Sequence, residues 1–512
     1  MRSLSAPIWI SSSHSPEVGC AFASVPFLVG EIEMPPYVPL PVVAIIGGGF
    51  TGAAVSLHLA SRNRAGREAR IVVFEPREKL GKGLAYDTDE PANRINVPAS
   101  KMSLFPDDPE SFARWIAETG ALAGDGTAFA PDGQPFPRRH VFGEYAFAMV
   151  APYLSSGAVE HRRTRVTGLT RSKGRWRVSA ADGADLEADL VVLATSHPET
   201  APPWVLSPLA GSPHYITDPT APGALDAIGR NDRVLIIGNG LTSADVVAAL
   251  SERGHVGHIV SISRRGLRSR GHPAVAREPF GDFVTQPAFT ASQLLFRIRG
   301  ALREARCLGL GWHPVLDAVR AQGQQIWRAL PVQARRRLAR HVRPYWDAHR
   351  FRIAPQLERV LDDAIRAGRL EVLAASLATA SVVGTALNVG VKLRGSDEIR
   401  ELTVDSVVVT TGPAHGGILK SQPFLTELET QGYLALCPTG LGLLCDGRSR
   451  TLGVDGKVAP GLFIGGPLAR GTFGELMGLP QVTDHAVFVA DQLSTALETL
   501  GADRRKEREL AG

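Results

Sequence analysis

The stretch VVAIIGGGFTGAAVSLHLA, residues 42–60, decides the fold class. Its β-branched start is typical of a buried strand, its glycines of a tight turn, and its small apolar residues of a helix. Gly47, Gly49 and Gly52 form the pattern G-x-G-x-x-G, and RIVVFEP follows as a second strand that ends near Glu75. Strand, glycine turn, helix, strand and acid in this order predict a dinucleotide-binding unit.

Each part of this unit suits one group of the nucleotide. The glycines let the backbone approach a pyrophosphate, and the helix N-terminus offers N–H groups and the positive end of its dipole. Glu75 would accept hydrogen bonds from the hydroxyls of a ribose. A carboxylate at this place favours a ribose without a 2′-phosphate, as in FAD or NAD.

A second unit of the same kind begins at residue 233 with RVLIIGNGLTSADVVAALSERG. Gly238, Gly240 and Ser243 give G-x-G-x-x-S, in which the small Ser still permits close packing of helix and strand. After the next strand, HIVSISRRG, Arg264 and Arg265 stand where the first unit has its acid. Two arginines there could hold a 2′-phosphate, which favours NADPH, or they could form a solvated turn. The choice between NADH and NADPH stays open.

A weaker repeat indicates how the two units are connected. Residues 175–196 read as a hairpin that leads into a buried strand, and residues 387–413 repeat this pattern. We therefore predict an α/β protein with two Rossmann-like dinucleotide-binding domains, the second inserted in the first, and with helical insertions. The predicted parts are an N-terminal extension (1–40), the first part of an FAD-binding domain (41–205, with a helical insertion at 85–155), an NAD(P)-binding domain (206–385, with a helical insertion at 280–355), the second part of the FAD-binding domain (386–500) and a polar tail (501–512).

The composition excludes several other classes of protein. The 512 residues are 44% hydrophobic and 21% charged, with a net charge of only +5, so we expect a folded, cytoplasmic protein without a nucleic-acid partner. The four cysteines form no CxxC pair, and no group of residues has metal-ligand spacing, so we expect neither a redox disulfide nor a metal. No secretory signal or membrane span is evident. Met34 precedes the first strand, so residues 1–33 are expected to be an extension or an over-long start.

Longer motifs resemble a known family. They are GKGLAYDTDEPANRINVPASKMSLFPDDPESFARWI at residues 81–116, FPRRHVFGEYAFAMV at 136–150 and WDAHRFRIAP at 346–355. With the two glycine patterns, they resemble flavoproteins that bind two dinucleotides, over nearly all of residues 41–500. This class includes flavin-containing and N-hydroxylating monooxygenases, and the bacterial FAD-dependent urate hydroxylases are the relatives with a stated activity that the motifs bring to mind.

The resemblance implies positions for both cofactors. It places FAD at the first glycine pattern and Glu75, and the nicotinamide nucleotide at the second glycine pattern. It brings a loop with Asn96, Lys101 and Met102 over the flavin, with Gly465 and Gly466 at the other end. Relatives often carry an acid after the strand at 463–465, where this chain has Gly466.

The activity implied is hydroxylation of a small polar substrate with NADH or NADPH and O₂, through a flavin C4a-peroxide, with urate to 5-hydroxyisourate as the named reaction. An N-hydroxylating or other flavin monooxygenase and an NAD(P)H:acceptor reductase are the alternatives. Because the flavin carries the chemistry, no catalytic side chain is predicted. Arg138, Arg139, Arg350 and Arg352 are candidates to position an anionic substrate, although each could instead form an ordinary ion pair. The oligomeric state is left open.

Overall fold

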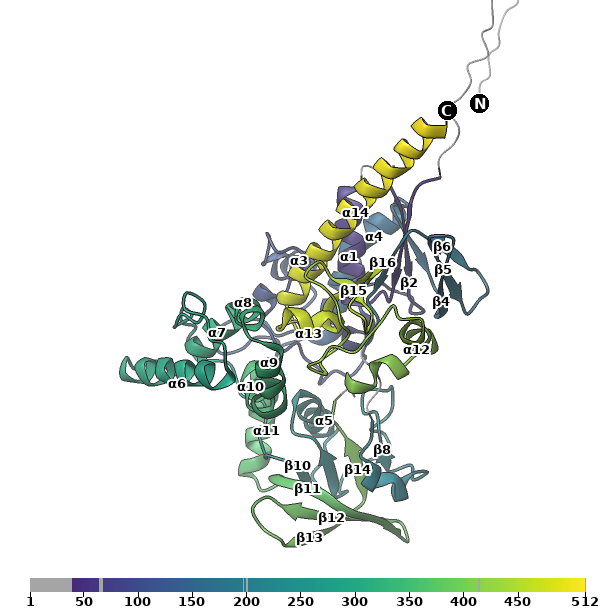
Figure 1. The fold of residues 1–512 in the computed structure, drawn as a ribbon. Helices are drawn as coiled ribbons and strands as arrows, with labels where there is room; N and C mark the ends of the chain where they lie inside the picture. Colours follow the sequence, from purple (N-terminus) through teal and green to yellow (C-terminus); the bar gives the residue numbers. More distant parts are fainter. Residues whose placement is uncertain (1–38, 64–67, 197, 199–200, 413–414, 512) are drawn as a thin grey trace, which may run out of the picture. The chain divides into compact units, whose positions relative to one another are not determined.

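A computed structural model describes residues 39–63, 68–196, 198, 201–412 and 415–511 (Figure 1). The predicted N-terminal extension lies almost wholly outside these residues. The stretch that decides the fold class forms β1 (Val42–Ile46) and the helix α1 (Phe50–Arg62), as predicted. No helix in the described part of the chain has the length and apolarity that a membrane crossing requires.

The first sheet has the strand order β15-β16-β7-β1-β2-β3. All neighbours pair in parallel except β15 with β16. The strands are β2 (Arg70–Phe74), β3 (Val159–Arg162), β7 (Leu190–Leu193), β15 (Arg450–Leu452) and β16 (Val458–Ile464). The sheet therefore joins residues 42–193 to residues 450–464.

Alternate residues of β1 enter two different cores, which explains why the whole strand is apolar. Val43 and Ile45 pack with α1 and with α14 (Gln481–Ala511) on one face. Val42 and Ala44 pack on the other face against a three-stranded sheet and α12 (Pro423–Thr430). The three strands are β4 (Val166–Ser172), β5 (Arg175–Ala180) and β6 (Leu186–Ala188).

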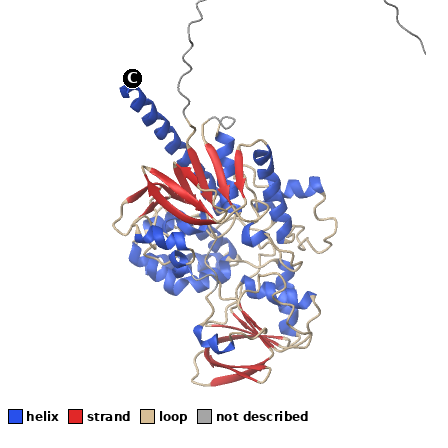
Figure 2. Ribbon diagram, turned by 90° about the vertical axis from the view of Figure 1, so that its right-hand side faces the viewer, coloured by secondary structure: helices blue, strands red, loops and turns tan. Residues whose placement is uncertain are grey.

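The second sheet has the order β13-β12-β11-β10-β9-β14-β8, and Figure 2 shows its strands as a group apart from those of the first sheet. Strands β8, β14, β9, β10 and β11 run in parallel, and β11, β12 and β13 form an antiparallel meander. The helices α5 (Leu241–Glu252) and α11 (Pro355–Arg366) cover one face. The strands are β8 (Tyr215–Ile216), β9 (Val234–Ile237), β10 (Ile259–Ser263), β11 (Leu370–Val383), β12 (Ala386–Leu393), β13 (Ile399–Val404) and β14 (Ser406–Val409).

Two insertions carry the remaining long helices. The first contains α2 (Gly83–Tyr86), α3 (Ser111–Thr119) and α4 (Arg139–Ser155), with loops between them. The second is helical over most of its length, as predicted, and its apolar faces meet around Phe283, Val315 and Leu330. Its helices are α6 (Ala291–Cys307), α7 (His313–Ala321), α8 (Gly323–Ala329), α9 (Val332–Arg337), η4 (Leu338–Val342) and α10 (Arg343–Arg350).

The fold class is confirmed, and the strand pairing corrects one predicted border. We assigned residues from 386 onward to the first domain, whereas β12, β13 and β14 belong to the second sheet. The strand Ser406–Val409 pairs in parallel with β9, just as β7 pairs with β1. Both partners require the same buried, apolar strand, so the pattern could not show which sheet it joins. The other predicted borders stay predictions, and α14 continues through most of the predicted tail.

Candidate functional site

The residues expected around FAD lie at the carboxyl edge of the first sheet. Gly47 follows β1, Glu75 follows β2, Ala194 follows β7 and Gly465 follows β16. Because these four strands are parallel, their carboxyl ends meet at one edge, where ligands of such sheets bind.

Gly47 is required by the backbone at this edge. Its φ is +99°, and a Cβ atom there would lie 2.5 Å from the carbonyl oxygen of Ala194. Gly52 is equally restricted, since its Cβ would lie 1.9 Å from the carbonyl oxygen of Gly47. Gly49 has less crowded surroundings, with Gly83 Cα at 3.4 Å as the nearest atom to a Cβ. Gly47 and Gly52 thus allow the tight turn to form, and Gly49 keeps the outer side of the turn free of side-chain atoms.

The donors and the acid at this edge fit a pyrophosphate and a ribose. The helix α1 has Gly49 as its N-cap and no side-chain cap, so its first N–H groups are available to an anion. The Glu75 carboxylate is buried and accepts hydrogen bonds from Gly48 N–H (3.0 Å) and from the Arg77 side chain (3.1 Å). These contacts hold Glu75 beside the glycine turn, where it was predicted to meet a ribose.

The second glycine pattern repeats this geometry. Gly238 follows β9 with φ +125°, and a Cβ there would lie 2.6 Å from the carbonyl oxygen of Thr410, which follows β14. Gly240 is the N-cap of α5, again without a side-chain cap, and no atom lies within 4 Å of the place of its Cβ. The space over Gly240 is therefore open for a second anionic group.

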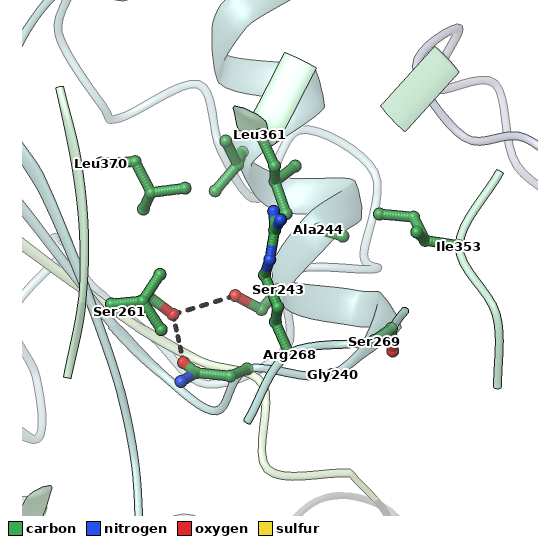
Figure 3. A pocket seen from close by; sticks show the side chains of 12 residues that line it. Gly240, Ser243, Ala244, Ser261, Arg268, Ser269, Ile353, Leu361 and Leu370 are labelled. Atoms are coloured by element: carbon green, nitrogen blue, oxygen red, sulfur yellow. Dashed lines mark hydrogen bonds between the residues drawn. The ribbon is translucent and has the colours of Figure 1, made fainter. Parts of the chain in front are cut away.

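A pocket lies beside this turn (Figure 3). Ser261 Oγ lies 3.2 Å from Ser243 Oγ and donates a hydrogen bond to the Asn239 side chain, so the predicted Ser243 joins a polar floor. Arg268 projects into the pocket and pairs with Asp362 at 2.5 Å. The hollow, counted with the solvent at its mouth, has about 330 Å³. Arg268 is a cation beside the second glycine turn that our sequence reasoning missed.

The two arginines after β10 differ in their surroundings. Arg264 is exposed, whereas Arg265 is partly buried and its guanidinium lies 5.0 Å from the centre of the Tyr345 ring. Hydrogen bonds from Arg265 and Arg394 lower the pKa of the Tyr345 hydroxyl. Arg264 is thus the freer of the two to meet a phosphate, and the role of both stays a prediction.

The loop predicted over the flavin connects to the second insertion. Asn96 accepts a hydrogen bond from Ala354 N–H (3.3 Å) through its side chain, and its carbonyl oxygen lies 3.0 Å from His272 Nε2. Burial lowers the pKa of His272 to about 4. Met102 is buried and Lys101 is exposed, on and beside the short helix η2 (Ala99–Lys101). Of the three predicted residues, Asn96 has the contacts that join this loop to other parts of the chain.

A histidine that sequence reasoning missed holds the loop after β16. Gly466 N–H donates to His485 Nδ1 (3.1 Å), so the ring proton is on Nε2, which donates to Ser449 Oγ (2.9 Å). Burial lowers the pKa of His485 to about 3, which keeps the ring neutral. Gly466 in turn abuts α1, since a Cβ there would lie 2.5 Å from Thr51 Oγ1. No pattern in the sequence singles out this histidine.

The four predicted substrate-positioning arginines all lie near carboxylates. Arg139 pairs with Asp245 of α5 at 2.7 Å, Arg350 with Glu475 at 2.5 Å, and Arg352 with Asp317 at 2.7 Å. Arg138 Nε is 3.9 Å from Asp125, whose own strong partner is Arg94. These contacts agree with the alternative that each arginine forms an ordinary ion pair, and contact with a substrate stays a prediction. Among the described residues, no group of His, Cys, Asp or Glu side chains could hold a metal ion.

Residues 44–198 match a protein-family model described as FAD-NAD(P)-binding. This segment contains the first glycine turn, Glu75, Asn96 and the strand β7 that braces the turn. The match therefore covers the part of the first-sheet site that precedes residue 199, and Gly465, Gly466 and His485 lie outside it. The comparison with curated proteins finds no match.

Several solved structures share the fold. Ornithine hydroxylase from Pseudomonas aeruginosa aligns over 90% of this chain and 100% of its own, with 16% identity and a TM-score of 0.59. L-lysine 6-monooxygenase from Pseudomonas syringae aligns over 90% and 99%, with 19% identity and a TM-score of 0.59. Ornithine N-hydroxylase from Kutzneria sp. 744 aligns over 91% and 100%, with 18% identity and a TM-score of 0.54. At these identities the likeness is one of fold.

Proposed function

We propose that this chain is an FAD-dependent monooxygenase that uses NADH or NADPH and O₂ to N-hydroxylate a small, amine-bearing molecule. The observation that carries the proposal is the pair of braced glycine turns, one at the carboxyl edge of each sheet of a single chain. Two such edges suit one flavin nucleotide and one nicotinamide nucleotide. The match of residues 44–198 to FAD-NAD(P)-binding proteins supports FAD at the first edge.

The residues of the first edge would hold FAD in a fixed place. The N–H groups at the start of α1 would bind its pyrophosphate, and Glu75 would accept hydrogen bonds from its ribose. His485 holds the loop after β16 through Gly466 N–H. This loop would border the flavin at Gly466, which carries no side chain. Bound FAD would supply the transfer of electrons from reduced nicotinamide to oxygen.

The residues of the second edge would deliver the nicotinamide nucleotide. The start of α5 and the open space over Gly240 would take its pyrophosphate, and Arg264 would meet a 2′-phosphate if NADPH is the donor. The structure of the Kutzneria ornithine N-hydroxylase holds reduced FAD, NADP⁺ and L-ornithine on the same fold. That likeness supports the assignment of one nucleotide to each edge.

The choice of substrate rests on the neighbours in fold. Three of them act on ornithine or lysine, which supports hydroxylation of an amine nitrogen. The expected urate reaction has no support among the comparisons and gives way to the N-hydroxylating alternative. An NAD(P)H:acceptor reductase would use the same two nucleotides, so only a hydroxylated product separates the two functions.

The test is an oxidation assay in air with FAD-loaded protein. NADH and NADPH would each be supplied with L-ornithine, L-lysine, L-aspartate or urate, and without substrate. We expect one amine to speed nucleotide oxidation and to gain one oxygen atom, detected by mass spectrometry. A one-oxygen product from urate alone would restore the urate reaction. Oxidation that yields no organic product, but that an added quinone accelerates, would instead establish a reductase.

A further inference from the structure

The helical insertion at 280–355 meets the loop after β16 at a group of buried arginines. Five guanidinium groups gather there, and three carboxylates accompany them, so two positive charges have no counter-charge within the group. The arginine cluster consists of Arg320 on α7, Arg343 and Arg350 on α10, Arg352, and Arg470 on α13 (Arg470–Phe473). The carboxylates are Asp317, Asp347 and Glu475.

Each carboxylate is already used by one arginine. Asp317 pairs with Arg352 at 2.7 Å and Asp347 with Arg343 at 3.1 Å. Glu475 pairs with Arg350 at 2.5 Å and accepts a further hydrogen bond from Trp346 Nε1 at 3.3 Å. The other two arginines form no ion pair with these carboxylates, although Glu475 acts electrostatically on both, Asp317 on Arg320 and Asp347 on Arg470.

Those two arginines have different surroundings. Among the residues that the structure describes, Arg320 donates to two neutral oxygens and to no carboxylate, namely to the Leu479 carbonyl (2.8 Å) and the Gln481 side chain (2.9 Å). For Arg470, no carboxylate among the described residues forms an ion pair, although its side chain is 93% buried, with a relative exposure of 7%. A buried cation without a partner is costly, so a structural role alone does not account for it.

Several N–H groups of the cluster also lack an acceptor. Arg320 Nε, Arg350 Nη2, Arg352 Nε and Arg470 Nη1 are buried and have no hydrogen-bond partner among the described residues. Arg350 has a relative exposure of only 8%, and its free Nη2 points toward Gly478, 3.5 Å from the place of a Cβ there. Asp347 Oδ1 is a buried acceptor of the cluster that also has no partner among the described residues, and it can serve only part of these four N–H groups. Buried donors are normally satisfied, so the remaining N–H groups indicate a missing acceptor.

The electrostatics of the cluster agree with this interpretation. Burial, together with the neighbouring guanidinium groups, lowers the pKa of Arg320 and of Arg470 to about 10. Arg350 is among the neighbours that act on both groups. An anion placed among Arg320, Arg350 and Arg470 would raise the pKa of Arg320 and of Arg470 again.

We propose that the arginine cluster binds an oxyanion of the substrate, a carboxylate or phosphate group, through Arg320, Arg350 and Arg470. Planar guanidinium groups suit both oxyanions, because each offers two parallel N–H donors. The assignment of this oxyanion to the hydroxylated molecule rests on the proposed function, whereas binding of the anion itself does not.

The place of the cluster supports a substrate rather than a remote anion. Arg350 and Arg352 stand four and two residues before Ala354, whose N–H donates to Asn96 on the loop expected over the flavin. On the other side, Arg320 holds residues 479 and 481 at the start of α14, where Thr483 donates to the carbonyl of Ser103 (2.8 Å). The cluster thus lies next to the Asn96 loop, which is expected over the flavin, and next to the start of α14, which contacts Ser103.

The first experiment measures anion binding without turnover. FAD-loaded full-length protein would be titrated calorimetrically with succinate, with inorganic phosphate and with NADP⁺, and NaCl of equal ionic strength would be the reference. We expect succinate or phosphate to bind and to raise Tm above the NaCl reference. The anion that binds identifies the oxyanion as carboxylate or phosphate. Binding of neither anion would overturn the proposal.

Variants locate the binding site. We expect Arg470→Gln and Arg320→Gln each to weaken binding of the anion at least tenfold and to leave NADP⁺ binding unchanged, while Arg470→Lys retains part of it. Arg303→Gln, an exposed arginine on α6 of the same insertion, is the matched control and should bind like the wild type. Because Arg470 forms no ion pair, Arg470→Gln should keep or raise Tm without the anion. Equal anion binding by all variants, or a loss of NADP⁺ binding instead, would overturn the proposal.

The two proposals fail in different experiments. If anions bind at the cluster but no amine is hydroxylated, the monooxygenase assignment is lost and the anion site stands. If an amine that carries a carboxylate is hydroxylated with the same KM by wild type and Arg470→Gln, the function stands and the oxyanion site is lost.

Discussion

Gly238 and Gly240 of the second turn are expected to have different roles, Gly238 in folding and Gly240 in nucleotide binding. Gly238 has a positive φ and no room for a Cβ beside the Thr410 carbonyl, whereas the Cβ of an alanine at 240 would project into open space. Gly238→Ala should therefore cost about 1–3 kcal/mol of stability from backbone strain. Gly240→Ala should leave Tm unchanged and weaken NADP⁺ binding by about tenfold, roughly 1.4 kcal/mol.

Calorimetry with NADP⁺ and thermal unfolding of both variants would check this contrast. Gly416→Ala is a suitable control, because its Cβ would also meet open space, away from the turn. If Gly240→Ala binds NADP⁺ as well as the wild type does, the second turn does not hold the pyrophosphate.

Arg264 offers a second test at the scale of the residue. It is exposed at the carboxyl end of β10, whereas Arg265 is engaged by Tyr345. A hydrogen bond to a charged group contributes about 1.5–3 kcal/mol, so Arg264→Gln should raise KM for NADPH by about 10- to 100-fold and leave KM for NADH unchanged. Steady-state kinetics with both nucleotides measure this. An equal effect on both nucleotides would contradict a contact with the 2′-phosphate.

For single residues, the sequence predicts which chemical groups a site contains better than it predicts which side chains contact one another. The glycine turns and Glu75 could be predicted because backbone geometry demands their residue types at fixed spacing. Arg268 and the arginine cluster could not, because their meaning depends on which distant side chains surround them. Arg350 was predicted to meet an anion, but nothing in the sequence brings it to Arg320 and Arg470.

Among the structural elements, the loop after β16 depends on one neutral histidine. The pKa of His485 is about 3 in the folded chain and 6.5 in its ordinary state, so the unfolded chain binds a proton more readily. Its contribution to stability is therefore complete above pH 6.5 and is lost as the pH falls toward 3. Between pH 6.5 and 5 the loss is about 2 kcal/mol at most.

His485→Gln should remove this part of the acid sensitivity. We expect Tm of the wild type to fall more steeply than that of the variant between pH 6.5 and 4.5, while His272 contributes the same slope to both. The variant should also release FAD more readily, because Gly466 loses its acceptor. Differential scanning calorimetry across this range gives the slopes, and parallel slopes would show that the ring is not held neutral.

The strands and helices themselves were largely predictable, with one instructive error. The apolar strand Ser406–Val409 has the same pattern as β7 but joins the other sheet. Periodicity indicates that a strand is buried on both faces, whereas its partner is chosen by packing with β9, from which the long stretch 238–405 separates it. The border at 385/386 was wrong for this reason.

Over the whole molecule, Arg139 of α4 and Asp245 of α5 form a largely buried ion pair between helices that follow the two glycine-turn units. Arg139 bonds Asp245 Oδ2, while Asp245 Oδ1 has no hydrogen-bond partner among the described residues, and burial raises the pKa of this carboxyl. Removing one member of such a pair typically costs about 3–5 kcal/mol, because the other charge stays buried. Arg139→Met should thus destabilise strongly, and Arg139→Met with Asp245→Leu should recover much of the loss.

A double-mutant cycle based on chemical denaturation measures the coupling of this pair. Arg233→Met and Asp405→Leu, which break an exposed ion pair at 2.9 Å, provide the matched control and should change stability by less than about 1 kcal/mol. Additive effects at Arg139 and Asp245 would show that the pair does not join the two units energetically.

The two residues whose carbonyl oxygens lie against the glycine turns, Ala194 and Thr410, also affect how the two sheets are connected. Ala194 and Thr410 not only press on Gly47 and Gly238 but also begin the two connections by which the chain passes from one sheet to the other. We expect a rotation of one sheet relative to the other to displace these two residues, because each begins a connection between the sheets. Each glycine turn thus lies against the start of a connection between the sheets. If the turns bind nucleotides as proposed, we expect bound nucleotide to restrict rotation between the sheets, and such rotation to weaken nucleotide binding.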